Sequence, residues 1–230
     1  MFSQVFLAQT GGEMEGFLAD NVAYMACHFS PYGKGLSNLP DMLPKGSILL
    51  LDDSTPPDGH DSKVVETELK ALIERVGIAA VLLDFQGEIL SESLDMARHL
   101  TNALPCPVAV TEGYAKELGC PVFLSPTPVN MAISDHIERW LPQGVYLEIA
   151  PMATCFTVTE KGCTSLPLHC IEALPLADER LHCHYNVEVF PDRAVFTLCR
   201  TKDDLNTLVR DAKRLGVLGT VGLYQELSQL

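Results

Sequence analysis

The chain has 230 residues, of which 30 are acidic and 16 basic, so its formal net charge at pH 7 is −14. This charge argues against nucleic acid or an anionic membrane as a partner, because both would repel it. The hydrophobic fraction of 47% is too high for a disordered chain, and no stretch approaches the roughly 20 apolar residues of a membrane-spanning helix. No basic residue precedes the apolar stretch within residues 1–9. This is unlike a secretory signal, so we expect a cytoplasmic protein.

Short apolar segments bounded by turn residues recur along the chain and predict strands. Residues 48–51 and 81–83 are continuously apolar, as is typical of parallel strands buried on both faces. Helical patterns with an apolar stripe follow several of these segments, at 63–76, 94–104, 133–141 and 202–215. The predicted strands are 4–8, 22–29, 47–52, 79–85, 107–111, 121–125, 145–150 and 220–224.

The alternation of strands and helices predicts a parallel α/β fold. The eight predicted strands fit a compact (β/α)8 TIM barrel that forms a single domain over residues 1–230, near the lower size limit of about 200 residues. A doubly wound open sheet is the alternative. No G-x-G-x-x-G or Walker loop supports that alternative, and we expect no cofactor.

Residues 154–200 interrupt this alternation. Two hairpins are predicted there, one turning at Lys161-Gly162 and the other at Pro191-Asp192. They predict a small α+β insertion with antiparallel strands between barrel strands seven and eight. Alternation along the second hairpin predicts that Cys183, Tyr185, Val187 and Val189 face inward and that His182 and His184 face water.

The eight cysteines include no C-x-x-C pair, so neither a zinc ribbon nor a thioredoxin motif is present. A structural zinc site needs about four converging ligands. We expect no metal site in the Cys/His-rich tract, because Cys183 is predicted to face away from His182 and His184. We interpret Cys27 as a packing residue, because adjacent strand residues point to opposite faces and Cys27 cannot pair with His28. The tract comprises Cys163, His169, Cys170, His182, Cys183 and His184.

Two segments carry a resemblance to a known family. Residues 77–87 resemble a fourth barrel strand that ends in D-G-x-D-x-D-x-E, and residues 201–216 followed by 219–226 resemble a closing helix and a glycine-containing strand that ends in an aromatic residue. Both features, and the order of elements over residues 22–226, are similar to those of glycoside hydrolase family 18, the chitinase-like barrels that include spore-cortex glycosidases. The resemblance implies a TIM barrel that binds a glycan containing N-acetylglucosamine.

The sequence departs from the family at the catalytic motif. Of the three motif aspartates only Asp84 remains, and Gln86 takes the position of the catalytic glutamate. Family members use the N-acetyl group of the substrate as nucleophile, but a carboxylic acid must still protonate the leaving oxygen. An amide cannot do so, and the resemblance therefore implies glycan binding with hydrolase activity lost or altered. A shifted register would align Glu88 with the catalytic glutamate; we prefer the first register because Gly77 and Gly87 then both match.

Active sites of such barrels lie at the carboxyl ends of the strands. Glu148 lies within an apolar strand, where an unpaired carboxylate is costly, so it needs a partner or a ligand. Two other functions remain open: an enzyme of another class that uses Asp84, Glu112 or Glu148 as acid or base, and a partner-binding module with no small-molecule site. The candidate site residues are Asp84 and Gln86 at the family's catalytic positions, and Glu112, Ser125, Glu148 and Tyr224 for substrate binding.

Overall fold

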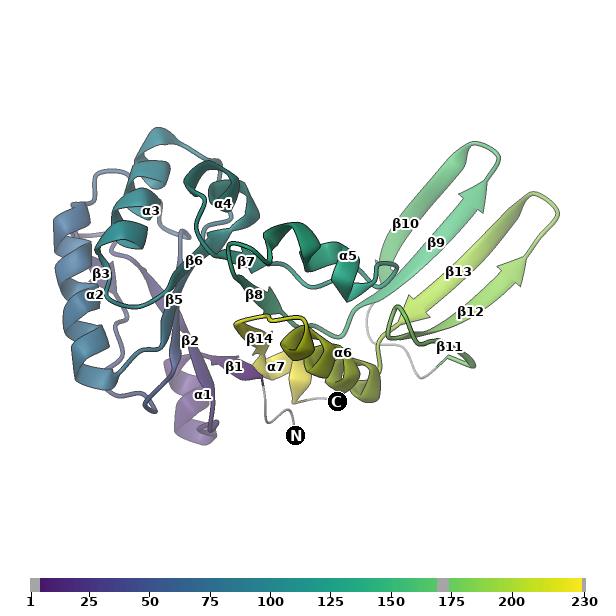
Figure 1. Cartoon of the computed structure of the whole chain (residues 1–230), viewed down its shortest axis with the longest axis horizontal. Coiled ribbons are helices and arrows are strands. Elements are labelled where there is room, and N and C mark those ends of the chain that lie inside the picture. Colours follow the sequence, from purple (N-terminus) through teal and green to yellow (C-terminus); the bar gives the residue numbers. More distant parts are fainter. Residues whose placement is uncertain (1–4, 169–173, 229–230) are drawn as a thin grey trace.

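The computed structural model describes residues 5–168 and 174–228. Within these residues eight parallel strands close into a barrel, because β1 (Phe6–Gln9) pairs with both β2 (Val22–Phe29) and β14 (Gly219–Leu223) (Figure 1). The predicted TIM barrel is therefore confirmed. Each predicted segment overlaps one barrel strand, with bounds that differ by at most two residues; residue 4, where the first was predicted to begin, lies outside the described residues. The other barrel strands are β4 (Ile48–Asp52), β5 (Ala80–Asp84), β6 (Val108–Thr111), β7 (Val122–Leu124) and β8 (Val145–Glu148).

Helices follow most of the barrel strands and cover the outside of the barrel. Their apolar stripes face the strands, as in α2, where Val65, Leu69 and Leu72 are buried. The last long helix begins with a capping box between Thr201 and Asp204, which satisfies free N–H groups of its first turn. No helix of the described chain is both long and apolar enough to cross a membrane. The helices are α1 (Gly11–Gly16), α2 (Ser62–Val76), α3 (Ser91–Ala103), α4 (Glu112–Leu118), α5 (Ile133–Ile137), the 3-10 turn Glu138–Trp140, α6 (Lys202–Arg214) and α7 (Tyr224–Leu227). A two-residue strand, β3 (Leu36–Ser37), pairs with β2 in the connection from β2 to β4.

Side-chain alternation along the strands separates two cores. One set of positions packs against the helices, and the other fills the barrel with residues such as Leu50, Leu82 and Tyr146. Because every second residue of a strand points inward, the next inward positions beyond these three residues are Asp52, Asp84 and Glu148. These three carboxylates therefore lie on the inner face of the barrel at the carboxyl end of its strands, which we call the mouth.

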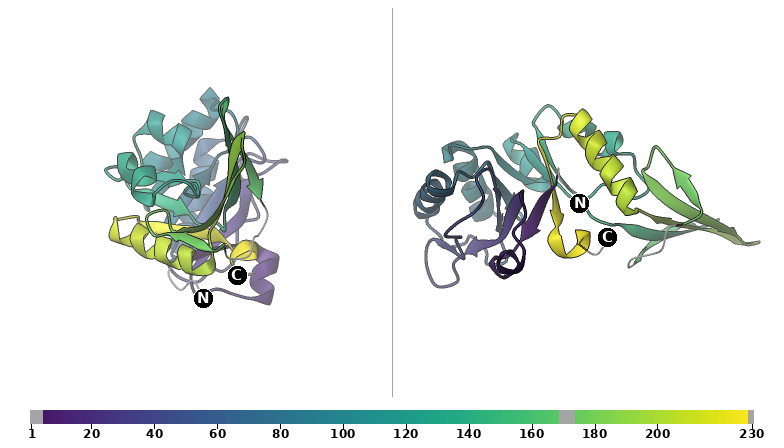
Figure 2. Two further views of the ribbon diagram at one scale, coloured as in Figure 1. Left: turned by 90° about the vertical axis from the view of Figure 1, so that its right-hand side faces the viewer. Right: turned by 90° about the horizontal axis from the view of Figure 1, so that it is seen from below.

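The predicted insertion lies between β8 and β14. It is a five-stranded antiparallel sheet in the order β10-β9-β13-β12-β11, and its two long hairpins extend away from the barrel (Figures 1 and 2). Its base is held by Arg200, which is 5% exposed and donates hydrogen bonds to the carbonyl oxygens of Thr127, Pro128, Leu181 and His182. The strands are β9 (Ala153–Thr159), β10 (Gly162–Leu168), β11 (Leu176–Asp178), β12 (Cys183–Val189) and β13 (Arg193–Cys199).

The predicted orientation of the two insertion histidines is wrong. His182 Nε2 lies 3.0 Å from Asp211 Oδ2, and His184 Nδ1 lies 2.8 Å from Asp204 Oδ2, so both rings contact α6 rather than facing water. The alternation of side chains along a strand does not show that a later helix, α6, packs beside the sheet and contacts these two rings. Cys183 is buried as predicted, whereas Val189, predicted to face inward, is 79% exposed because it lies near the end of a hairpin.

The Cys/His-rich tract is only partly described. His169 and Cys170 lie outside the described residues. Within residues 5–168 and 174–228, no group of three or more His, Cys, Asp or Glu side chains is arranged to hold a metal ion.

Candidate functional site

A cavity of about 280 Å³ opens at the mouth, at the carboxyl ends of β5, β6, β7 and β8. A second cavity, of about 110 Å³, is lined by residues from β1, β2, β4 and β14. Asp84, Phe123 and Glu148 line both cavities, so the two are adjacent. We refer to the pair as the mouth cavities.

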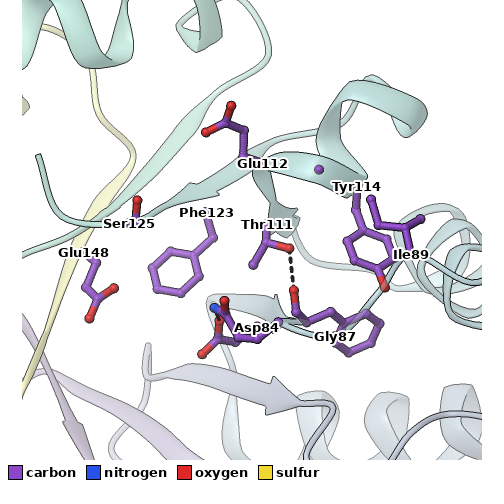
Figure 3. A pocket seen from close by; sticks show the side chains of 12 residues that line it. Asp84, Gly87, Ile89, Thr111, Glu112, Tyr114, Phe123, Ser125 and Glu148 are labelled. Atoms are coloured by element: carbon purple, nitrogen blue, oxygen red, sulfur yellow. Dashed lines mark hydrogen bonds between the residues drawn. The ribbon is translucent and has the colours of Figure 1, made fainter.

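Phe123 supplies the aromatic surface shared by the mouth cavities. Its side chain is 6% exposed, and its ring lies in the middle of the lining residues, with Glu148 to one side and Thr111 to the other in the view of Figure 3. A ring in this position offers an apolar face to a bound molecule, while the surrounding oxygen atoms offer hydrogen bonds.

The end of β5 is organised by hydrogen bonds among polar side chains. The Gln86 amide donates to Asp84 Oδ1. The backbone N–H groups of Gln86 and Gly87 donate to the two carboxylate oxygens of Asp53, each over 2.9 Å. A Cβ atom at residue 87 would lie 2.9 Å from Asp53 Oδ2, so a side chain at this position would displace the Asp53 carboxylate from its present place.

Two acidic neighbours and partial burial act on the Asp84 carboxyl. Burial raises the pKa of Asp84, the hydrogen bond from Gln86 opposes this effect, and the charges of Asp52 and Asp53 raise the pKa further. The result is a carboxyl group whose pKa lies above its ordinary value and whose orientation is set by Gln86.

Glu148 faces Asp84 across the mouth cavities without a hydrogen-bonding partner among the described residues. Burial, together with the charges of Asp84 and Glu226, raises the pKa of Glu148 to about 7. Oε2 of Glu226 is itself inaccessible to solvent and accepts no hydrogen bond from the described part of the chain. Neither Glu148 nor Glu226 forms an ion pair with a described residue, and of the two only Glu148 lines the mouth cavities.

Glu112 and Ser125 line the larger cavity but differ from Glu148 in their surroundings. Glu112 forms ion pairs with Arg139 and, over 3.0 Å, with Lys116. The hydrogen bond from Lys116 and the nearby positive charges hold the pKa of Glu112 below its ordinary value. Ser125 is exposed, and its carbonyl oxygen lies 3.0 Å from His136 Nε2.

Tyr224 is not among the residues that line the mouth cavities. It is the first residue of α7, and its ring stacks on Phe17 with 5.5 Å between ring centroids and 15° between ring planes. The other five residues selected from the sequence all line the larger cavity.

The residues selected from the sequence do not include Phe123, Asp53 or Glu226. Asp53 and Glu226 are recognisable as polar residues near strand ends, but Asp53 lies in a loop rich in proline and glycine, which predicts a surface residue. Phe123 lies two residues before Ser125, and strand alternation would have placed both on the inner face of the barrel. The roles of Asp53 and Glu226 depend on contacts with other strands, which no local pattern indicates.

Cys27 is fully buried, and burial, with the charges of Asp52 and Glu68, raises the pKa of its thiol to about 12. The thiol is therefore neutral at physiological pH, which agrees with a packing role.

No protein-family model matches the sequence, and no curated protein matches it. Solved structures do match its fold. A chitinase from Cycas revoluta, in a form with a Glu-to-Gln substitution and in complex with (GlcNAc)4, is 11% identical, covers 95% of this chain and 94% of its own, and gives a TM-score of 0.57. A chitinase-like agglutinin from Robinia pseudoacacia is also 11% identical, covers 97% of both chains and gives a TM-score of 0.55.

The spore cortex-lytic enzyme SleL of Bacillus cereus is 9% identical, with a TM-score of 0.51 over 88% of this chain. The present chain spans 63% of the length of that enzyme. Together these similarities show that the chain has the fold of family 18 chitinases.

Proposed function

We propose that this protein binds a glycan containing N-acetylglucosamine in the mouth cavities and does not hydrolyse it by the family 18 mechanism. The observation that carries the proposal is the pair formed by Asp84 and Gln86 at the end of β5. An amide stands at the position that resembles the family's catalytic acid, and it donates its hydrogen bond to the neighbouring carboxylate.

The chemistry of the cavities fits recognition of a sugar. Gln86 and Asp84 together offer donor and acceptor atoms for hydroxyl or acetamido groups. Phe123 offers an aromatic surface against which the apolar face of a sugar ring can pack. A volume of about 280 Å³ for the larger cavity lies near the lower limit for small-molecule sites, so we assign it one sugar unit of a longer chain that continues into solvent.

The proteins that share the fold support this assignment. The Cycas chitinase holds (GlcNAc)4 in a form with a Glu-to-Gln substitution, and the Robinia protein is an agglutinin with a chitinase-like structure. Sugar binding on this fold is therefore compatible with a glutamine in place of a glutamate.

One observation favours a second function, an enzyme of another class. Glu148 has a pKa of about 7 and lies beside Asp84, and a carboxyl group that titrates near neutral pH is suited to general acid catalysis. Glu112 is a poor candidate for the acid, because its ion pairs with Lys116 and Arg139 favour the ionised form.

Isothermal titration calorimetry with the N-acetylglucosamine tetramer, combined with chromatography of the incubated sugar, tests the proposal. We expect binding without cleavage, and a loss of affinity of about tenfold in Gln86→Ala, which corresponds to about 1.4 kcal/mol. Glu88→Gln is the matched control, because Glu88 is exposed and lines neither cavity.

The absence of binding at millimolar sugar would contradict the proposal and leave the partner-binding module as the better account. Cleavage that Glu88→Gln abolishes would show that Glu88 is the acid and that the shifted register is right. Cleavage that Glu148→Gln abolishes but Gln86→Ala leaves unchanged would establish the second function.

A further inference from the structure

The charges of the side chains that line the mouth cavities indicate the charge of the ligand as well as its class. We propose that the sugar unit seated between Asp84 and Glu148 carries a free amine, as in glucosamine without its N-acetyl group, and that the two carboxylates bind its ammonium. This inference rests on the proposed function, because it specifies the chemistry of the ligand at the same site.

Every charged side chain that lines the mouth cavities is acidic. Asp52, Asp84 and Glu148 lie at the inward strand-end positions of β4, β5 and β8, and Glu112 completes the set. Glu112 is neutralised by Lys116 and Arg139. None of the described residues that line either cavity is a lysine, arginine or histidine, so the other carboxylates have no counter-charge within the cavities.

A second observation concerns unmet hydrogen bonds. Oε2 of Glu226 is inaccessible to solvent and unpartnered in the described chain, and its carboxylate acts electrostatically on Glu148, which hydrogen-bonds no described residue. Buried polar atoms in folded proteins nearly always have a partner, and an unpaired carboxylate in such a place is costly. Glu226 lines neither cavity, so a ligand in the mouth can meet only Glu148. A partner for Glu148 has to donate a hydrogen bond, and a positive charge on that partner would offset the charges of Asp84 and Glu226.

An organic ammonium meets these requirements better than a metal ion. No cluster of three or more potential ligands in the described chain is arranged to hold a metal. An ammonium has three N–H donors, enough to serve both Asp84 and Glu148. Phe123 lines both cavities, and the face of an aromatic ring attracts a cation while also packing against the sugar ring that carries it.

Binding of an ammonium must also change the protonation of Glu148. The titratable groups that face Glu148 are Asp84 from β5 and Glu226 from α7, and Asp52 from β4 faces Asp84 in turn. All three are acidic and keep the pKa of Glu148 high. A bound ammonium opposes them, lowers the pKa of Glu148 and releases its proton, whereas a neutral acetamido group does not.

Isothermal titration calorimetry of the full chain compares the glucosamine tetramer with the N-acetylglucosamine tetramer at about pH 6, where Glu148 carries its proton. Titrations in two buffers of different ionisation enthalpy count the protons released. We expect the glucosamine tetramer to bind at least about tenfold more tightly and to release a proton. In Glu148→Gln the proton release disappears and the preference falls by about tenfold; Asp84→Asn, as the second variant, lowers the preference to a similar extent.

A chain with a net charge of −14 attracts any polycation, so a charge-matched control is needed. Glu88→Gln removes one exposed carboxylate that lines neither cavity, and we expect it to change the affinity by less than about twofold at physiological salt. An equal loss of affinity in Glu88→Gln and Glu148→Gln would overturn the inference in favour of general charge attraction.

The remaining outcomes separate this inference from the proposed function. Equal or tighter binding of the N-acetylglucosamine tetramer would overturn the inference and leave the proposed function standing. Failure of both tetramers to bind at millimolar concentration would overturn both. Circular dichroism of each variant shows whether it is folded, and the comparison between the two tetramers in the unmodified chain decides the question without any variant.

Discussion

Replacement of Glu148 by glutamine tests the electrostatics of the mouth without any ligand. The two side chains have nearly the same shape, but glutamine does not ionise. In the folded protein the pKa of Glu148 is raised from 4.5 to about 7 by burial and by the charges of Asp84 and Glu226. The folded state therefore holds this proton more tightly than the unfolded state does, and Glu148 destabilises the fold increasingly as the pH rises from about 4.5 to about 7.

The size of this effect follows from the shift. Each pKa unit corresponds to about 1.4 kcal/mol, so the full shift corresponds to about 3 kcal/mol, of which about 2.5 kcal/mol develops between about pH 5 and pH 8. Solvent at the open mouth screens part of the interaction, and we expect about 1–2.5 kcal/mol. Glu148→Gln should therefore gain this much unfolding free energy relative to the unmodified protein when the pH is raised over this range.

Equilibrium urea denaturation of both proteins at the two pH values measures the effect. Carboxyl groups with lowered pKa values, such as Glu112 and Asp204, lose their stabilising effect as the pH falls, but they do so in both proteins and cancel in the difference. Glu88→Gln, at an exposed residue that lines neither cavity, is the matched control. A difference for Glu148→Gln that is the same at both pH values would refute the reasoning, because Glu148 would then titrate in the folded state as it does in the unfolded chain.

Three further outcomes are expected. Arg200→Met should lower the unfolding free energy in urea by about 3 kcal/mol, because several buried carbonyl groups lose their donor; Arg193→Met, on the surface, should change it by less than about 0.5 kcal/mol. Tyr224→Leu should leave the affinity for the glycan within about twofold in calorimetry but lower the unfolding free energy by about 1 kcal/mol, because the ring packs on Phe17; a large loss of affinity would place Tyr224 in the binding site. Protein purified without a histidine tag should contain less than stoichiometric zinc by elemental analysis, and one tightly held zinc that is lost in Cys170→Ser would contradict this.

The barrel was predictable because its strands are short apolar runs with turn residues on either side. Residues 48–51 and 81–83 are buried on both faces. Every one of these positions must therefore be apolar, whichever residues pack against it, and such a run can be recognised in the sequence alone. The insertion was predictable for a related reason, since turn residues mark its two hairpins. Pro191-Asp192 lies in the second turn as predicted, whereas the first turn is at Glu160-Lys161, one residue earlier than predicted, because Gly162 already pairs with Thr159. The orientation of His182 and His184 was not, because it depends on Asp211 and Asp204 in a helix that follows about 20–30 residues later.

At the mouth, too, features set by a local strand pattern were predictable, and features set by contacts between distant elements were not. Asp84 and Glu148 were found because each ends an apolar strand and shares its inward face. Tyr224 follows the last strand directly, but α7 begins at this residue, and the helix rather than the strand determines where its ring points. The pairing of Glu112 with Arg139 joins residues on different elements, and no pattern in the sequence indicates it.

Closure of the barrel between β1 and β14 has a consequence for biosynthesis. About 70 residues, including the whole insertion, separate β8 from β14, and a ribosome needs about 4–14 seconds to add them. During this interval β1 and β8 have no partner on the side where β14 will later pair, and unpaired strand edges are prone to join other chains. Until β14 is synthesised, these two strand edges stay open, and the barrel is exposed to pairing with other chains during this interval.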